Sequence, residues 1–372
     1  MLEYYGKYAG CKIFTDEVEE TAISQVYNML NSIVFDGCNI RIMPDIHAGA
    51  GTVIGFTSTI TDKIIPNVIG VDIGCGVDAW KLANREIDFQ MLDDFIRNNI
   101  PYGYNVHDTV LDFDAFLDDE HKYFKDEVEI ICASTKQKYH RVLKSLGSLG
   151  GGNHFIEIDK DQNGDYWLLI HSGSRNFGLQ IATYYQKIAV ANMGKCNRLE
   201  YLEDNYAEEY LRDMKVAQFY ADLNRKLMGH LILNDYLEMP TTEYVSSVHN
   251  YISFDDHIIR KGAISAHKDE KVVIPWNMKD GAIIGTGLGN EDWNCSAPHG
   301  AGRTMSRSKA KKEIKLEDFE QCMSNVWSSC ISSGTLDEAP QAYKSYKKIQ
   351  DALSETVRID YQLKPVYNFK AS

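Results

Sequence analysis

Apolar residues recur at helical spacing in several parts of the chain. In residues 16–33 they come every four positions, from Val18 to Leu30, which predicts an amphipathic helix. A longer stretch, residues 207–237, repeats the pattern, with Leu211 and Met214 on one side. The apolar face of such a helix is typical of packing into a core. The predicted helices cover residues 16–33, 207–237, 315–328 and 344–358.

Short apolar runs between polar residues predict strands at 39–43, 68–71 and 167–170. Two of these runs end at residues that can carry chemistry, Asp72 and His171. Helices and strands alternate without the regular rhythm of a doubly wound sheet, so the pattern predicts only a mixed α and β fold. Because no linker, repeat or low-complexity tract interrupts the chain, we predict one domain over residues 1–372.

Composition narrows the class of protein. Hydrophobic residues make up 44% and charged residues 25% of the chain, which is typical of a globular enzyme. The net charge of −14 disfavours charge-driven nucleic-acid binding over most of the surface, so a phosphate ligand needs a local basic site or metal ions. One basic cluster exists, at residues 303–312. No apolar run approaches the ~20 residues of a membrane span, and the start does not resemble a signal peptide, so we expect a cytoplasmic protein.

The eight cysteines are scattered and never form a CxxC pair. This spacing argues against a disulfide framework or a zinc ribbon and predicts reduced thiols.

Several histidines stand in glycine-rich or strand-end contexts, unlike the others. They are His47, His154, His171, His249 and His299; we assign no role to His107, His121, His140, His230, His257 or His267. The segment VIGVDIGCGV adds Asp72 and Cys75, three residues apart on a glycine-rich turn. Carboxylate, thiolate and imidazole together suit a divalent transition metal, and the number of donors favours two ions with Cys75 as a bridge. Zinc and manganese both fit this set.

His299 stands in APHGAGRTMSR, between a proline and two glycines. Proline and glycine shape a loop there rather than a regular helix or strand. Arg303 and Arg307 follow with planar donor forks suited to phosphate. The motif predicts a nucleophile or general acid beside a phosphate site; taken alone, it also fits a structural loop with solvated arginines.

The motifs VDIGCGV, GGGNHFIE, IHSGSR, HNY and PHGAGRTMSR, in this order, resemble the RtcB family of RNA-splicing ligases, in particular its short bacterial branch. The resemblance extends from KIFTDEVEETAISQ to the carboxyl-terminal LKPVYNFKAS. It implies an α+β fold: one compact domain with central mixed β-sheets flanked by helices and a metal centre in a cleft.

The resemblance also implies an activity. Such enzymes join RNA ending in a 3′-phosphate or 2′,3′-cyclic phosphate to RNA with a 5′-hydroxyl, using GTP and Mn²⁺. They form a histidine–GMP intermediate and an activated RNA(3′)pp(5′)G end, in RNA repair or tRNA splicing. An activating partner similar to archease is compatible with this class. The alternatives are a metal-dependent phosphoesterase and an RNA 3′-end capping enzyme that use the same site.

Site residues follow from the resemblance motif by motif. His299 is implied as the guanylylated nucleophile, with Asp45 and His47 supporting the site from its second shell. The implied metal ligands are Asp72, Cys75, His154, His171 and His249. The implied nucleotide contacts are Asn153, Glu157, His299, Gly300, Gly302 and Lys370, and the implied RNA or phosphate contacts are Arg175, Arg303 and Arg307.

The chain departs from the family pattern in three places near this chemistry. The tail reads FKAS, around Lys370, rather than the usual KG ending. Trp276 stands where the family usually has glycine, close to a nucleotide-contacting loop. The segment between Cys75 and His154 is short, which predicts a reduced RNA-binding surface and a different choice of substrate.

Overall fold

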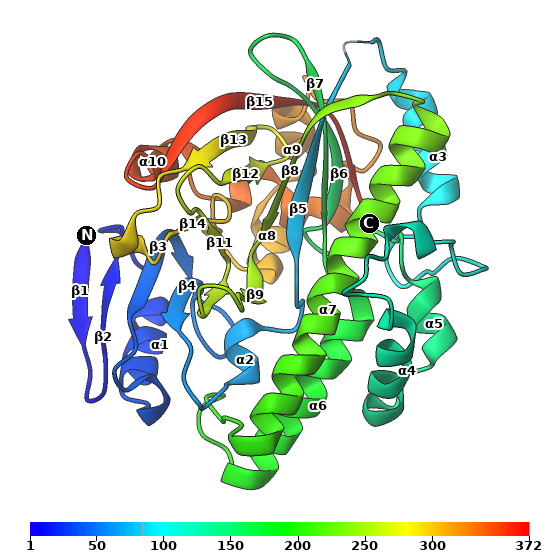
Figure 1. The fold of residues 1–372 in the computed structure, drawn as a ribbon. Helices are drawn as coiled ribbons and strands as arrows, with labels where there is room; N and C mark the ends of the chain where they lie inside the picture. Colours follow the sequence, from blue (N-terminus) through cyan, green and yellow to red (C-terminus); the bar gives the residue numbers. More distant parts are fainter. Residues whose placement is uncertain (84, 372) are drawn as a thin grey trace.

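The computed structural model describes residues 1–83 and 85–371 (Figure 1). The helices are α1 (Glu20–Leu30), α2 (Pro66–Ile69), α3 (Phe89–Asn99), α4 (Phe124–Thr135), α5 (Tyr139–Lys144), α6 (Arg175–Met193), α7 (Asp204–His230), α8 (Arg307–Glu313), α9 (Leu316–Cys322) and α10 (Tyr346–Leu353). The strands are β1 (Leu2–Tyr5), β2 (Gly10–Ile13), β3 (Ile40–His47), β4 (Ile54–Thr59), β5 (Gly76–Leu82), β6 (Phe155–Lys160), β7 (Tyr166–Ser172), β8 (Thr241–Val248), β9 (Asn250–Ile252), β10 (Ile258–Lys261), β11 (Ala263–Ser265), β12 (Lys271–Asn277), β13 (Gly281–Gly287), β14 (Ser296–Pro298) and β15 (Val357–Lys370).

Two large sheets and one small sheet form the framework. The first large sheet has the order β1-β2-β3-β4-β10-β9, with a parallel pair at β2–β3. The second has the order β12-β13-β15-β6-β7-β5-β8, and all of its neighbouring strands are antiparallel. Strands β11 and β14 pair with each other. The predicted class, a mixed α and β fold with central sheets and flanking helices, is confirmed.

The register of the second sheet brings distant segments to one end. Gly76, at the start of β5, lies opposite Ser172 on β7 and opposite Val248 on β8. Phe155, at the start of β6, lies opposite His171 on β7. Because antiparallel neighbours run in opposite directions, the residues that enter β5 and β6 meet the residues that leave β7 and β8. This end of the sheet is therefore where four separate segments converge.

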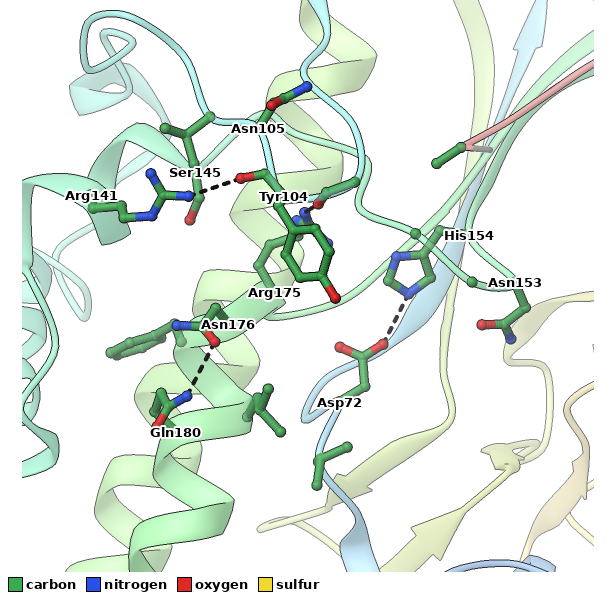
Figure 2. A pocket seen from close by; sticks show the side chains of 18 of the residues that line it. Asp72, Tyr104, Asn105, Arg141, Ser145, Asn153, His154, Arg175, Asn176 and Gln180 are labelled. Atoms are coloured by element: carbon green, nitrogen blue, oxygen red, sulfur yellow. Dashed lines mark hydrogen bonds and ion pairs between the residues drawn. The ribbon is translucent and has the colours of Figure 1, made fainter. Parts of the chain in front are cut away.

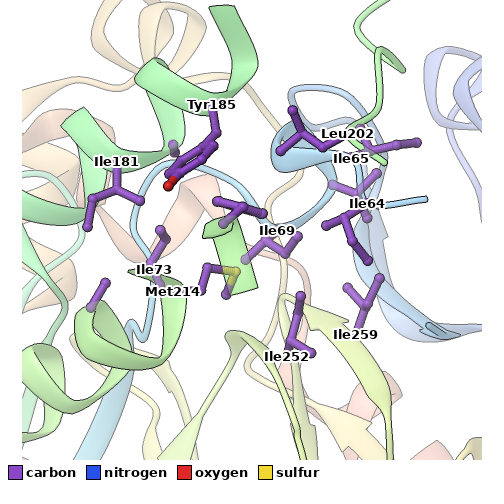
Figure 3. Packing of buried hydrophobic residues seen from close by; sticks show 14 of the residues in the cluster. Ile64, Ile65, Ile69, Ile73, Ile181, Tyr185, Leu202, Met214, Ile252 and Ile259 are labelled. Atoms are coloured by element: carbon purple, nitrogen blue, oxygen red, sulfur yellow. The ribbon is translucent and has the colours of Figure 1, made fainter. Parts of the chain in front are cut away.

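The loop that enters β5 rests on a buried apolar layer between the first large sheet and the long helices α6 and α7. Figure 3 shows this layer, with α2 and the following residues packed against α6 and α7. Its labelled members are Ile64, Ile65, Ile69, Ile73, Ile181, Tyr185, Leu202, Met214, Ile252 and Ile259. Apolar packing on both sides of Asp72 thus fixes the backbone from which its side chain projects.

Three sequence predictions need correction. Residues 68–71, predicted as a strand, belong to the helical turn α2 and its end: Pro66 occupies the first turn, and Gly70 terminates it with φ 96°. The predicted helix 315–328 ends at Cys322, and the predicted helix 344–358 ends at Leu353, before β15 begins. In both cases the chain leaves the helix because the following residues join turns or a sheet.

The other predicted elements are confirmed with shifted ends. The helix predicted at 16–33 is α1, and the one predicted at 207–237 is α7, followed by a π-helical turn over Leu231–Tyr236. The strands predicted at 39–43 and 167–170 lie within or overlap β3 and β7. The eight cysteines are free thiols. Within the described residues, no helix is long and apolar enough to cross a bilayer.

Candidate active site and metal centre

The convergent end of the second sheet collects the side chains predicted as metal ligands. Cys75 precedes β5, His154 precedes β6, His171 lies near the end of β7, and His249 follows β8. The Cys75 Sγ atom lies 3.2 Å from His171 Nε2 and 3.5 Å from His154 Nε2. A distance of 3.3 Å joins the Nε2 atoms of His171 and His249. His154 Nε2 lies 2.9 Å from Asp72 Oδ2, as Figure 2 shows from the side of the larger cavity.

These donors form two overlapping groups. Cys75, His171 and His249 make one group, and Asp72, Cys75 and His154 make the other, with the donor atoms of each group within 4.8 Å of one another. Cys75 belongs to both. Imidazole, carboxylate and thiolate are ligands for divalent transition metals, so the residues fit two ions that share the cysteine sulfur.

Hydrogen bonds fix the orientation of two of the imidazoles. His154 Nδ1 donates to the Leu149 carbonyl at 2.8 Å, and His171 Nδ1 donates to the Asn153 carbonyl at 3.2 Å. Each ring therefore keeps its Nε2 lone pair toward the cluster, which is the usual outer-shell arrangement of metal-binding histidine. Burial holds the pKa of His171 and of His249 well below the usual value, so both rings are neutral and available as ligands.

The remaining two ligands respond differently to burial. Burial and the neighbouring Asp72 raise the pKa of the Cys75 thiol well above its usual value. A bound cation would favour the thiolate, because it supplies the positive charge that the pocket lacks. For Asp72, burial raises the pKa, but His154, Cys75 and Arg175 together outweigh it, and the net pKa lies below the usual value.

His299 is placed beside this cluster by the small β11–β14 sheet. Pro298 pairs with Ala263, and the neighbouring Gly262 N–H donates to the His249 carbonyl at 2.6 Å. The ring centroids of His249 and His299 are consequently 4.9 Å apart. On its other side, His299 Nδ1 lies 2.7 Å from Oδ2 of the fully buried Asp45. His299 Nδ1–H donates to this carboxylate, so in the neutral ring the lone pair lies on Nε2, which is directed away from Asp45.

His47, predicted to support the site together with Asp45, lies next to this pair. Its Nδ1 is 3.0 Å from the backbone oxygen of Asp45, and burial lowers its pKa to about 4. His47 is therefore a neutral ring that can hold the Asp45 backbone in place by donating a hydrogen bond.

An inner pocket of about 120 Å³ opens next to His299. It is lined by His47, Asn153, Glu157, His171, His249, Trp276, His299, Gly300, Gly302, Arg303, Arg307, Glu338 and Lys370, among others. Gly302 adopts φ 70°, and a Cβ atom there would lie 2.4 Å from the Asp45 carbonyl oxygen, so only glycine fits this close approach. The residues predicted to contact the nucleotide therefore lie around one pocket.

Two charged groups of the inner pocket are buried. Burial raises the pKa of the Glu157 carboxyl, although Asn368 Nδ2 donates to it at 2.5 Å. Lys370 Nζ donates to Glu338 Oε2 and to the Asn153 carbonyl, both at 3.2 Å. Because β15 pairs with β6, Lys370 lies opposite Phe155, which brings the carboxyl-terminal lysine to the pocket.

Asp72 and His154 line a separate outer cavity of about 1080 Å³ (Figure 2). Asn153, Arg307 and Glu338 line both spaces, so the inner pocket and the outer cavity adjoin at these residues. Of the cluster, Asp72 and His154 line the outer cavity, and His171 and His249 line the inner pocket.

The three predicted arginines differ in how many of their guanidinium donors already bind other groups of the protein. Arg303 donates to the Asp337 carbonyl at 2.5 Å and to Glu338 Oε1 at 3.3 Å, so much of its guanidinium is bound internally. Arg175 donates to the Gly103 carbonyl at 2.7 Å and lines the outer cavity. Within residues 1–83 and 85–371, the ion pairs of Arg307 are long, at 3.7 Å to Asp337 and 3.7 Å to Glu338. Arg307 is the freest of the three to bind a phosphate.

Sequence reasoning missed Glu338, Arg225 and Asp78. Glu338 ends the 3-10 helix Ser333–Glu338 and carries no motif that marks it. Arg225 is fully buried on α7; its Nε donates to Asp78 Oδ1 at 2.8 Å, and its Nη1 donates to the carbonyls of Gly74 and Ser172. The sequence signal for Arg225 was its position as a charged residue on the apolar side of the predicted helix 207–237. Arg225 ties the loop that carries Cys75 to the strand that carries His171.

A family model described as tRNA-splicing ligase RtcB matches residues 25–371. The chain belongs to the RtcB family. RNA-splicing ligase RtcB of Escherichia coli strain K12 is 34% identical over 94% of this chain and 94% of its own length. RNA-splicing ligase RtcB1 of another Escherichia coli strain has the same identity and coverage. A tRNA-splicing ligase RtcB of Nanoarchaeum equitans is 27% identical over 96% of this chain and 91% of its own length.

The resemblance stated from the motifs is thus confirmed, and the RtcB family model covers every motif that carried it. The departure at Trp276 lies on the wall of the inner pocket, where the indole is buried and stacks with Tyr346 at 6.0 Å between ring centroids. In this RtcB-family chain, a large aromatic ring therefore occupies space at the inner pocket.

Replacing Arg225 by methionine is expected to destabilise the fold by about 3–5 kcal/mol, because it leaves the buried Asp78 carboxylate without its cation. Ser246 and Tyr244 still donate hydrogen bonds to Asp78 but carry no charge. Urea unfolding should show a lower midpoint at an unchanged slope. Lys226→Met is the matched control, since Lys226 is half exposed on the next position of α7, and its loss should change stability by less than about 0.5 kcal/mol. Equal midpoints for the two variants would contradict this role of Arg225.

Proposed function

We propose that this protein is a GTP- and Mn²⁺-dependent RNA ligase that joins RNA 3′-phosphate or 2′,3′-cyclic phosphate ends to 5′-hydroxyl ends through a histidine–GMP intermediate. The observation that carries the proposal is the placement of His299: it contacts the buried Asp45 on one side and lies against His249 of the two-group metal cluster on the other. The names of the RtcB relatives, RNA-splicing and tRNA-splicing ligases, support the choice of substrate. RNA repair or tRNA splicing in the cytoplasm is the proposed setting.

His299 has the geometry of a nucleophile. Asp45 accepts a hydrogen bond from Nδ1–H, so the Nε2 lone pair of the neutral ring is free to attack the α-phosphorus of GTP, with pyrophosphate as the leaving group. As the Nε2–P bond forms, positive charge develops on the imidazole, and the Asp45 carboxylate stabilises it. Divalent cations held by the two ligand groups would neutralise the phosphate charges that otherwise repel a nucleophile.

The guanosine nucleotide is proposed to occupy the inner pocket. Asn153, Glu157 and Lys370 supply polar contacts there, and Gly300 and Gly302 allow close approach of the backbone next to His299. Lys370 and Glu338 already bind each other, so a nucleotide either replaces one of these contacts or joins the pair.

The RNA ends are proposed to meet at the junction of the two spaces, near Arg175 and Arg307. The RNA 3′-phosphate attacks the phosphorus of His299–GMP, which breaks the P–N bond and gives RNA(3′)pp(5′)G. The 5′-hydroxyl then attacks the activated phosphate, forms the phosphodiester and releases GMP. A cyclic phosphate is opened by water before the first of these steps. Arg303, bound to Asp337 and Glu338, is proposed to hold the motif loop in shape while it faces the nucleotide phosphates.

The test is an RNA-joining assay with GTP and MnCl₂, run on 3′-phosphate and 5′-hydroxyl RNA ends, with intact-protein mass measured before RNA is added. A GMP-sized, acid-labile adduct and a joined RNA are the expected results. An adduct with capped but unjoined RNA would favour the capping alternative. Release of phosphate without an adduct would favour the phosphoesterase alternative, and either outcome would overturn the ligase proposal.

Asp45→Asn is expected to slow guanylylation of His299 on the order of 10²- to 10⁴-fold, because the neutral amide cannot stabilise the charge that develops on the imidazole. Metal content and nucleotide affinity should remain close to those of the unaltered protein, since Asp45 lies in neither ligand group. The rate of adduct formation by mass spectrometry checks this. Asp62→Asn, at a highly exposed position, serves as the control. Unchanged kinetics in Asp45→Asn would remove the proposed role of the carboxylate.

A further inference from the structure

Tyr104 presents its ring to the outer cavity without packing against the protein. Its exposed fraction is 95%, although it lines the cavity that reaches Asp72 and His154. Figure 2 shows the ring projecting into this space, with its hydroxyl toward the Asp72–His154 pair in that view. A large aromatic side chain left this exposed at the mouth of a cavity is available to stack on a ligand.

The backbone that carries this ring is held in place by two arginines. Arg175 Nη2 donates to the Gly103 carbonyl at 2.7 Å, and Arg141 Nη2 donates to the Tyr104 carbonyl at 2.9 Å. The Gly103 N–H also donates to the Gly150 carbonyl at 2.8 Å. The loop is therefore fixed on both sides of Tyr104, and a stacking ligand would not have to order it.

The same cavity carries positive charge that the protein leaves unpaired. Lys136, Lys138 and Arg141 are exposed on its wall and form no salt bridge within residues 1–83 and 85–371. The acidic residues of the wall are neutralised in part: Asp337 pairs with Lys311, and Glu338 pairs with Lys370. In a chain of net charge −14, this is a local basic surface of the kind that binds a polyanion.

We propose that the outer cavity holds an unpaired RNA strand that ends in a phosphate, with one base near that end stacked on Tyr104. This inference rests on the proposed function and names the part of the site that selects the substrate. Lys136, Lys138 and Arg141 contact the phosphates of the strand, and its end lies at Asp72, His154 and Arg175, where cationic and metal-binding groups gather. A base can stack on a side chain only when it is not stacked within a duplex, so the strand is single at this point.

Binding is tested on the full chain with MnCl₂ but without GTP, by fluorescence anisotropy of a short single-stranded RNA with a 3′-phosphate. Tyr104→Ala should weaken binding about 5- to 150-fold, and Tyr104→Phe should restore it, because the stacking surface is the ring. Lys138→Ala should lower the slope of log affinity against log salt by about 0.7, as expected for one lost phosphate contact on a single strand. Unchanged affinity in Tyr104→Ala would overturn the inference.

A second experiment changes the RNA instead of the protein. Among RNAs that each lack one base near the 3′-phosphate end, one should bind the unaltered protein as weakly as the complete RNA binds Tyr104→Ala, and these two losses should not add. Additive losses, or a base dependence found only for the 5′-hydroxyl strand, would overturn the assignment. So would a poly-aspartate peptide that binds with the same dependence on Tyr104 and Lys138, since it would identify a protein partner instead.

Guanylylation without RNA separates this inference from the proposed function. Tyr104 does not line the inner pocket, so Tyr104→Ala should form the GMP adduct at the unaltered rate while its RNA affinity falls. If the unaltered protein forms no GMP adduct, the ligase proposal is overturned. If the adduct forms normally but Tyr104→Ala binds RNA with unchanged affinity, only the inference about Tyr104 is overturned.

Discussion

His299→Ala is expected to abolish the GMP adduct completely. Alanine offers no nucleophilic atom. The neighbouring histidines His154, His171 and His249 belong to the ligand groups, whereas His299 contacts the carboxylate of Asp45. Without the covalent intermediate the RNA 3′-phosphate is not activated, so joining of 3′-phosphate RNA should fall to the background level as well. Intact-protein mass after incubation with GTP and MnCl₂ gives the first readout, and the ligation assay gives the second.

Three measurements make this result decisive. His140→Ala, at an exposed position outside both spaces, should form the adduct normally. The His299→Ala protein should retain its metal, because His299 belongs to neither ligand group. It should also join an RNA that already carries the (3′)pp(5′)G end, since that substrate needs no transfer from histidine. An adduct that persists in His299→Ala would place the nucleophile elsewhere.

The elements predicted best are those whose sequence pattern decides between helix and strand. The spacing from Val18 to Leu30 has the helical period, and α1 forms there. At residues 68–71 the apolar run is too short to show a period, and the surrounding structure makes it part of a helical turn. Pro66 before the run and Gly70 within it were the local signals for that turn. The ends of α9 and α10 depend on where the chain joins turns and β15, which local spacing does not encode.

The sequence predicted which motif residues form the site, but it did not predict the distances between them. Histidines at strand ends, such as His154 and His171, are visible in the sequence because glycines and apolar runs surround them. Their mutual distances depend on the antiparallel register of β5, β6, β7 and β8, which no local pattern determines. The contact between Asp45 and His299 joins residues 254 positions apart. The resemblance to the RtcB family implied that Asp45 and His47 support the site, but it did not imply the contact between Asp45 and His299.

Residues without a motif could not be found from the sequence. Glu338 binds Lys370 inside the inner pocket, yet its segment has no periodic pattern or chemical signature. Tyr104 is one tyrosine among many until the structure shows its ring at the outer cavity. The positions of Glu338 and Tyr104 depend on packing between segments that are far apart in the sequence, and a local sequence pattern does not predict such packing.

The sharing of Cys75 between two ligand groups leads to a second large effect. Cys75→Ser is expected to lower bound Mn²⁺ from the proposed two ions to fewer than one per chain and to reduce RNA joining at least about 100-fold. A serine hydroxyl remains neutral where the cation would convert the thiol to a thiolate, so both groups lose an anionic ligand. The metal content after dialysis against MnCl₂ and removal of free metal is the direct measurement.

Asp72→Asn separates a bridging role from a general weakening of the site. Asp72 belongs to only one group, so this variant should lose one ion and keep the one held by Cys75, His171 and His249. Cys132→Ser changes a buried free thiol far from the cluster in sequence and in neither ligand group, and should keep both ions. If Cys75→Ser and Asp72→Asn lost the same single ion, the sulfur would serve one metal and the second group would need another ligand. A loss of both ions from Cys75→Ser alone is the result that only a shared sulfur explains.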